Sequence, residues 1–496
     1  MEVFYQSTRN KNEKVTASQA ILKGLSDEGG LFVPVTIPAL TKSLKELSEM
    51  SYKEVAYEVL KSYLTDFTKE ELEHCINSAY DEKFDTEEIA PMVEADGAYY
   101  LELFHGATIA FKDMALSILP HLMITSARKN NVQNDIVILT ATSGDTGKAA
   151  LEGFKDVPGT KIMVFYPNDG VSPMQKLQMT TQEGANVSVC AINGNFDDAQ
   201  SGVKAIFTNK DIAAKLEENG MMFSSANSIN WGRLVPQIVY YVSAYADLIE
   251  NGTIKNGDPM NVVVPTGNFG NILAAYYAKR MGVPVNKLIC ASNANNVLTD
   301  FLKSGTYDKN RKFFTTTSPS MDILISSNLE RLLFHLTDEN DAKLRDWMGA
   351  LSSEGKYTVD ADVAEKVSAL FDAGCCDDEE TKETIAKTFK DGYLCDTHTA
   401  VAVKVFEEYV KATGDKTETV IASTANPYKF SEAVLNAVDT VPADADEFQQ
   451  VELLVKATGE PCPPQLANLS DKEVRFTSVC DKEDMTKMVY GMLGIN

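Results

Sequence analysis

The sequence predicts an α/β fold of parallel, twisted sheets with helices on both faces, preceded by a mostly helical N-terminal region. From about residue 96, short β-branched runs alternate with helical stretches, and repeated strand–loop–helix units are typical of parallel strands joined by right-handed crossovers. The runs are continuously apolar, which favours sheets covered on both faces. With 496 residues, the chain is too long for one ordinary core, so two or three domains are expected.

The first region, residues 1–95, is expected to form a mostly helical domain. A short strand fits MEVFYQ at its start, and apolar residues recur at intervals of three and four over residues 18–26 and 48–64. That spacing predicts two helices. SDEGGLFVPVTIP lies between them and is predicted to be a loop because of its glycines and prolines.

The strand-forming runs that follow divide into an α/β domain over residues 96–255 and a larger α/β domain over residues 256–496. Each run precedes a loop and a helical stretch. The segments are IVILTA (136–141), KIMVFYP (161–167), NVSVCAI (186–192), NVVVPTGNFG (261–270), KLICASNA (287–294) and ETVIASTANP (418–427). Residues 337–392 are rich in charge, and we expect them to be helical with a solvated face.

Charge and residue usage argue against several classes of function. The net charge is −25, and such a surface repels nucleic-acid phosphates and anionic lipid, so neither is expected as a partner. Eight cysteines without a CxxC pair indicate reduced thiols, and five histidines without metal-ligand spacing argue against a zinc enzyme. No secretory signal and no stretch of 18 apolar residues is present, so a cytoplasmic protein is expected.

The segment PTGNFGN, residues 265–271, is predicted to bind an anion. It follows an apolar strand and precedes a helical stretch, and its two glycines allow a close approach to a ligand. The first N–H groups of the helix and the helix dipole favour a phosphate. A turn without a ligand is the alternative. Neither GxxxxGKS/T nor GxGxxG is present, so a single phosphate is expected rather than a pyrophosphate.

Two further loops offer polar groups between a strand and a helix. TATSGDTGKAA (140–150) has hydroxyls and glycines that suit a carboxylate. SSANSINWGRLVPQ (224–237) has neutral donors followed by Arg233, as a second phosphate would require. These neutral donors are Asn227, Ser228 and Asn230. For both loops the alternative is a set of helix caps without a ligand.

Lys112 stands in FHGATIAFKDMA (104–115), between Phe111 and Asp113. A free lysine amine has a pKa of about 10.4 and is a poor nucleophile near pH 7. Burial among Phe104, Phe111 and their neighbours would lower that pKa, and a neutral amine can condense with an aldehyde. A surface salt bridge is the alternative. Because Lys112 occurs with a single-phosphate loop and a carboxylate loop, the sequence predicts pyridoxal 5′-phosphate (PLP) as cofactor.

Four segments in this order resemble the threonine synthase family. FHGATIAFKD is similar to the PLP-lysine signature of that family, FHGPTxxFKD, and TSGDTG, NSINWGR and GNFGN match it in identity and order. STRN and AILKGLSDEGGLFVP near the start match as well. The resemblance covers essentially the whole chain, whose length suits the longer, bacterial- and fungal-like branch.

The resemblance implies a fold-type-II PLP enzyme, similar to the tryptophan synthase β subunit, with Lys112 as the Schiff-base lysine. The residues that would hold the cofactor phosphate are Gly267, Asn268, Phe269, Gly270 and Asn271. Thr424 would hydrogen-bond the pyridine nitrogen through a neutral hydroxyl, which leaves the ring a milder electron sink. The residues that would bind the substrate are Asn227, Ser228 and Arg233 at its phosphate, and Ser143, Gly144 and Thr146 at its carboxylate.

The chain departs from the family pattern at three positions. Ala107 replaces the usual proline of HGPT, which removes no catalytic group. Asn426 stands where relatives often carry histidine. Asp145 occupies the place where shorter relatives have an asparagine that faces the 3′-oxygen of the cofactor. A carboxylate would repel that phenolate, so no contact to the 3′-oxygen is assigned.

The implied reaction converts O-phospho-L-homoserine and water to L-threonine and phosphate, by β,γ-elimination and β-addition of water. The expected partner is this small-molecule substrate, and the protein would be a monomer or a homodimer. One alternative is another fold-type-II PLP lyase such as serine/threonine dehydratase, whose substrate has no γ-phosphate for Arg233 to bind. Another is a non-catalytic binding module on the same fold.

Overall fold

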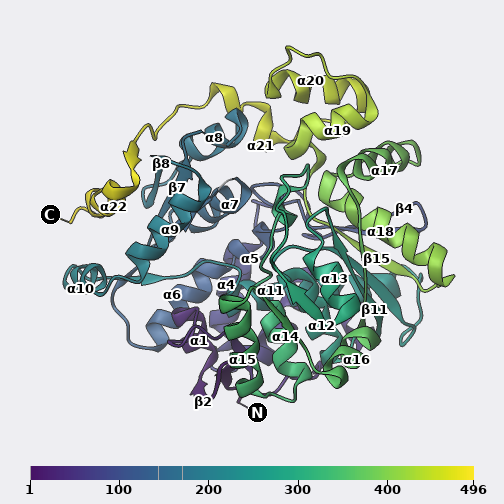
Figure 1. Ribbon diagram of the computed structural model, residues 1–496, viewed down its shortest axis with the longest axis horizontal. Helices are drawn as coiled ribbons and strands as arrows, with labels where there is room; N and C mark the ends of the chain where they lie inside the picture. Colours follow the sequence, from purple (N-terminus) through teal and green to yellow (C-terminus); the bar gives the residue numbers. More distant parts are fainter. Residues whose placement is uncertain (1, 143, 170, 496) are drawn as a thin grey trace.

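Two β-sheets, each covered by helices, lie side by side above a helical N-terminal region (Figure 1). The computed structural model describes residues 2–142, 144–169 and 171–495. None of the helices in these ranges is both long and apolar enough to cross a bilayer. The expected α/β class with helices on both faces of parallel sheets is confirmed.

The larger sheet has the strand order β14-β11-β10-β15-β5-β4. Its strands are β4 (Met92–Ala95), β5 (Ala98–Glu102), β10 (Met260–Pro265), β11 (Val285–Ser292), β14 (Phe371–Cys375) and β15 (Thr419–Ser423). Neighbours are parallel except β4, which runs antiparallel to β5. Its principal helices are α11 (Trp231–Glu250), α12 (Gly270–Met281), α13 (Val297–Ser304), α14 (Leu329–Leu336), α15 (Asp341–Ser353), α16 (Ala361–Leu370), α17 (Asp378–Lys390) and α18 (Thr397–Thr413).

Successive residues of β10 explain why helices cover both faces of this sheet. Val262 and Val264 pack into the cluster that contains α12, whereas Val263 packs into the cluster that contains α18. Side chains alternate across a strand, so a continuously apolar run supplies an apolar surface to each face.

The smaller sheet is wholly parallel, with the order β16-β8-β7-β6-β9. Its strands are β6 (Asp135–Ala141), β7 (Thr160–Pro167), β8 (Val187–Asn193), β9 (Met221–Ser224) and β16 (Val479–Asp481). The helices around it are α5 (Asp113–Leu116), α6 (Leu119–Lys129), α7 (Asp145–Phe154), α8 (Pro173–Thr180), α9 (Phe196–Phe207) and α10 (Lys210–Glu218). The last helices are α19 (Ser431–Val438), α20 (Glu447–Thr458), α21 (Pro464–Ala467) and α22 (Met485–Leu493), and α22 lies beside α9.

The N-terminal region adds a small antiparallel sheet to its helices. The strands are β1 (Tyr5–Ser7), β2 (Asn10–Val15) and β3 (Phe32–Pro34), and the helices are α1 (Ala17–Lys23), α2 (Leu44–Leu47), α3 (Tyr52–Tyr63) and α4 (Lys69–Ala79). The ring of Trp231 lies 5.3 Å from that of Tyr5 and 5.5 Å from that of Tyr63. This region therefore packs against the start of α11, where Arg233 lies.

All six predicted strand runs form strands, but other strands join the sheets out of chain order. β4 and β5 precede the smaller sheet in sequence and belong to the larger one, while β16 returns to the smaller sheet near the C-terminus. The expectation that residues 337–392 are helical is wrong in part, because β13 (Lys356–Thr358) pairs with β12 (Thr306–Asp308) and β14 pairs with β11. The expected division at residues 95 and 255 stays a prediction.

Candidate active site

Five loops converge where parallel strands end. They follow β5, β6, β9, β10 and β15, and they carry, respectively, Lys112, Gly144, Asn227, Gly267 and Thr424. Ligands of open α/β sheets bind in the crevice at the carboxyl ends of the strands. The topology therefore brings every predicted binding segment to the same side of its sheet.

Lys112 is partly buried, and its surroundings favour the neutral amine. Its Nζ donates to Ser320 Oγ at 3.1 Å and lies 5.2 Å from the centre of the Phe111 ring. Burial lowers the pKa of Lys112; the carboxylate of Asp145 opposes that effect, whereas the cations Lys429 and Arg233 add to it. The direction agrees with the requirement for a nucleophilic amine.

The residues around Lys112 in sequence form a hydrogen-bonded turn. The backbone N–H of Thr108 donates to Asp113 Oδ2 at 2.8 Å, and its hydroxyl donates to Asp113 Oδ1 at 2.6 Å. Burial raises the pKa of Asp113 to about 6. A Cβ on Gly106 would lie 2.6 Å from the Asp113 side chain, so only glycine fits there. The motif thus encodes the turn that presents Lys112.

The loop after β10 forms an open anion cradle at the start of α12. Phe269 has a left-handed backbone with φ of 65°, and a Cβ on Gly267 would lie 2.6 Å from the backbone oxygen of Ser320. The first helical bond runs from Leu273 N to Phe269 O at 3.0 Å, so the preceding N–H groups have no helical acceptor. These groups can bind one phosphate.

Asn271 lies at the same end of α12, and its side chain is oriented by two tyrosines of α11. Its Oδ1 accepts hydrogen bonds from Tyr240 OH, at 2.8 Å, and from Tyr241 OH. Within the described ranges its buried Nδ2 has no partner. Because a buried donor without an acceptor is costly, the site fits an anionic group such as the phosphate of PLP.

Arg233 supplies a second unpartnered donor at the first turn of α11. Its Nη1 donates to Ala226 O at 2.7 Å, but its buried Nε has no partner among the described residues. Burial lowers the pKa of Arg233 to about 10, so the guanidinium remains charged at neutral pH. A buried cation with a free donor fits a second anion.

The neighbours of Arg233 differ in what they offer. Asn227 is exposed and Ser228 is half-buried, so both could contact a ligand. Asn230 is one of the neutral donors of this loop, but its amide is not available to a ligand. Its Nδ2 donates to Ile21 O and Ser225 O while its Oδ1 caps Gly232 N. The amide is fully used in joining α1 to the start of α11.

The loop after β6 is closed by its own hydrogen bonds. Thr142 Oγ1 accepts from Gly144 N at 3.0 Å and from Gly147 N at 3.1 Å. The half-buried Thr146 on α7 is therefore a better candidate than Thr142 for a substrate carboxylate. Ser143 lies outside the described residues, so its assignment stays a prediction.

The loop after β15 holds the segment that carries Lys112. Thr424 O accepts from Phe111 N at 2.8 Å, and Asn426 N donates to Ile109 O at 3.0 Å. Asn426 Oδ1 also accepts from Tyr428 N at 3.0 Å and caps the short 3-10 turn η2 (Pro427–Phe430). Asn426 thus has a local capping function, and the buried Thr424 is held near Lys112.

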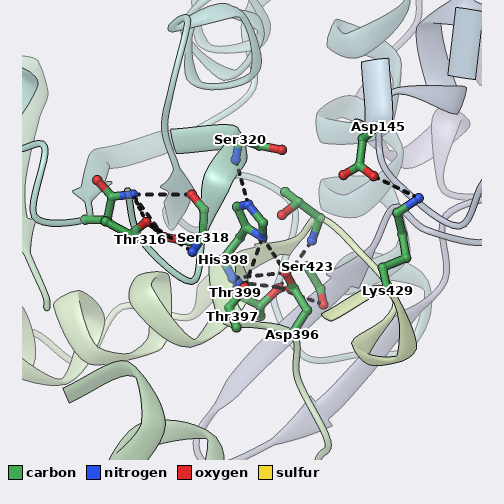
Figure 2. A network of polar contacts seen from close by, with 12 residues as sticks. Asp145, Thr316, Ser318, Ser320, Asp396, Thr397, His398, Thr399, Ser423 and Lys429 are labelled. Carbon is green, nitrogen blue, oxygen red and sulfur yellow. Dashed lines mark hydrogen bonds and ion pairs between the residues drawn. The ribbon is translucent and has the colours of Figure 1, made fainter. Parts of the chain in front are cut away.

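Sequence reasoning missed several residues that position these loops. Figure 2 shows His398 Nε2 accepting from Ser320 N, at 3.1 Å, while His398 Nδ1 lies 2.7 Å from Asp396 Oδ2. At the N-cap of α14, Asn328 Nδ2 donates to Ser228 O and Asn268 O, and within that helix Arg331 Nη2 donates to Ile229 O. These contacts join segments about 60 to 100 residues apart, which no local motif indicates.

Comparison with known proteins defines the class first. Residues 87–424 match the family described as pyridoxal-phosphate dependent enzyme, the class to which this fold and a lysine between two anion sites belong. Residues 4–80 match the threonine synthase N terminus, and residues 399–489 match the threonine synthase C-terminal family. The chain belongs to the threonine synthase family.

Individual relatives agree over nearly the whole chain. Threonine synthase of Saccharomyces cerevisiae is 37% identical, with 88% of this chain and 89% of that protein covered. The crystal structure of PLP-bound threonine synthase from Brucella melitensis has a TM-score of 0.88 at 36% identity, with 99% of both chains covered. Human threonine synthase-like 1 is 41% identical over 89% of this chain. The chain spans 61% of the length of that curated relative.

Proposed function

We propose that this protein is a threonine synthase, which uses PLP to convert O-phospho-L-homoserine and water to L-threonine and phosphate. The observation that carries this proposal is a pair of separate anion sites near Lys112. One is the cradle at the start of α12, and the other is Arg233, whose buried Nε has no partner among the residues that the structure describes. The phosphate of the cofactor would occupy the first site, and the phosphate of the substrate would occupy the second.

Each predicted residue then has a defined task. Bound PLP would supply an electron sink for the charge that develops at the α-carbon of the substrate. Lys112 carries the cofactor, and its neutral amine removes and returns the α-proton. The Thr424 hydroxyl would donate a hydrogen bond to the pyridine nitrogen of the cofactor. The residues assigned to the cofactor phosphate are Gly267, Asn268, Phe269, Gly270 and Asn271.

The substrate is held at both ends. Arg233, with Asn227 and Ser228, binds its phosphate and retains that group after elimination. The start of α7 binds its carboxylate; the residues assigned there are Ser143, Gly144 and Thr146. Holding both ends fixes the α-, β- and γ-carbons in front of Lys112, and this orientation contributes directly to the rate.

We further propose a cytoplasmic enzyme that acts as a monomer or a homodimer. All eight cysteines are free thiols, which supports a reducing compartment.

The test is the product spectrum of the PLP-loaded protein. O-phospho-L-homoserine should release phosphate and threonine in equal amounts, and threonine should release no ammonia. Ammonia from threonine without phosphate from phosphohomoserine would instead identify a dehydratase. Lys112→Ala is the control for chemistry at the site.

A further inference from the structure

Asp145 and Lys429 form a buried ion pair that none of the roles above uses. Lys429 Nζ lies 3.1 Å from Asp145 Oδ1, and the two side chains are only 3% and 9% exposed. The same ammonium donates to Thr108 O at 2.8 Å. Lys429 therefore joins the start of α7, the segment that leads to Lys112, and the turn η2 after β15. Figure 2 shows its contact with Asp145.

This pair presents two opposite charges to Lys112. Burial would raise the pKa of Asp145, but Lys429 and Lys112 outweigh that effect and hold it at about 2. Asp145 is therefore a carboxylate at neutral pH. Among the other charged groups that face Lys112, Arg233 from α11 repels its ammonium and Asp113 from α5 attracts it. Asp145 is the strongest attractive charge in the set, and Lys429 is the strongest repulsive one.

We propose that Asp145 and Lys429 act together as a positioning pair for Lys112, an inference that rests on Lys112 carrying the cofactor. Asp145 attracts the Lys112 ammonium toward the start of α7. Lys429 opposes that attraction, so that the amine can lose its proton and react.

The step that the pair controls is the attachment of PLP. The neutral amine of Lys112 adds to the aldehyde carbon, and the aldehyde oxygen leaves as water with both hydrogens of the amine. Only the neutral amine has the lone pair for this addition. The pH dependence of attachment therefore reports the charge balance around Lys112 without any substrate turnover.

The experiment uses the full-length protein freed of cofactor, with PLP as the probe. The rate of covalent attachment is followed by absorbance from about pH 6 to about pH 10. Lys429→Met should shift the rate profile to higher pH by at least about half a unit, since Asp145 then stabilises the Lys112 ammonium unopposed. Asp145→Asn should shift it to lower pH by a similar amount. The double variant should lie between the two single variants.

Lys429→Arg keeps the charge and should keep the wild-type profile. Circular dichroism and melting curves check folding, and the shift of Asp145→Asn keeps the inference testable if Lys429→Met does not fold. An unshifted profile in Asp145→Asn, with normal attachment of PLP in the wild type, would overturn the inference and leave the proposed function intact. If the wild type attached no PLP at Lys112 at any pH, that result would instead contradict the proposed function itself.

Discussion

The loops after β10 and β6 are both glycine-containing connections from a parallel strand to a helix. In the first loop the backbone carbonyls accept hydrogen bonds from other segments, whereas in the second the backbone N–H groups donate within the loop. After β10, outside groups hold the loop carbonyls: Ser326 Oγ donates to Gly267 O at 2.7 Å, and Asn328 N donates to Asn268 O at 3.0 Å. After β6, Thr142 binds the N–H groups of its own loop. Among the described residues, the first arrangement leaves N–H groups at the start of α12 available for a phosphate, whereas the second uses the N–H groups of Gly144 and Gly147.

Similar sequences therefore give different sites, depending on where the backbone hydrogen bonds go. The loop after β10 should bind the cofactor phosphate through its backbone N–H groups, so added side-chain atoms in this loop should weaken binding. The carboxylate loop should bind through side chains and through whatever backbone donors Thr142 leaves. Four substitutions or pairs of substitutions test that difference, and they follow in order of expected effect.

Lys112→Ala removes the amine that is proposed to carry the cofactor between these two loops. Turnover of O-phospho-L-homoserine should fall by about 10²–10⁴-fold or more, because a positioned base contributes that much to rate. Absorbance and phosphate release measure the two consequences, loss of bound cofactor and loss of activity. Retention of most activity would show that another residue carries the chemistry.

Arg233→Lys keeps a charge but replaces a planar fork with a single ammonium. Losing a charged hydrogen bond costs about 1.5–3 kcal/mol, so kcat/KM for O-phospho-L-homoserine should fall by roughly 10–150-fold. Cofactor retention should stay near that of the wild type, as absorbance after gel filtration will show. Equal loss of substrate use and cofactor retention would show that Arg233 does not act on the phosphate of the substrate alone, and would contradict its assignment.

Gly267→Ala tests shape in the phosphate loop, with Gly270→Ala as its matched control. A Cβ at Gly267 would lie 2.6 Å from the Ser320 backbone, whereas at Gly270 the nearest atom, Asn328 Nδ2, would be 3.5 Å away. Overpacking costs about 1–3 kcal/mol, so Gly267→Ala should lower thermal stability and weaken PLP binding. Similar PLP dissociation constants for both variants would contradict this account of the cradle.

Thr142→Val and Thr146→Val separate the internal and external hydroxyls of the other loop. Thr142→Val leaves the N–H groups of Gly144 and Gly147 without their acceptor, which should cost about 1–3 kcal/mol of unfolding free energy. Thr146→Val should change stability by no more than about 0.5 kcal/mol while raising KM. Denaturant unfolding and steady-state kinetics measure the two effects. If Thr146→Val lowered stability and Thr142→Val raised KM, then Thr146 would be the structural hydroxyl and Thr142 the substrate-binding one.

Local sequence predicted much of this molecule because much of it is locally encoded. The apolar runs became strands, and the glycine, threonine and aspartate that form the turn around Lys112 all lie within one short motif. By contrast, β14 was missed because FDAGC contains no β-branched residue, and its pairing partner β11 lies about 80 residues away. The Asp145–Lys429 pair, Ser320 and His398 act across the fold, where periodicity carries no information.

The central claim is that the amine of Lys112 condenses with a phosphorylated aldehyde bound at the α12 cradle. The most direct measurement is borohydride reduction of the PLP-loaded protein, followed by peptide mapping of the labelled residue. We predict a single pyridoxyl adduct on the peptide that contains FHGATIAFKD, at Lys112. A coloured protein whose label maps to another lysine, or that gives no adduct, would contradict the account.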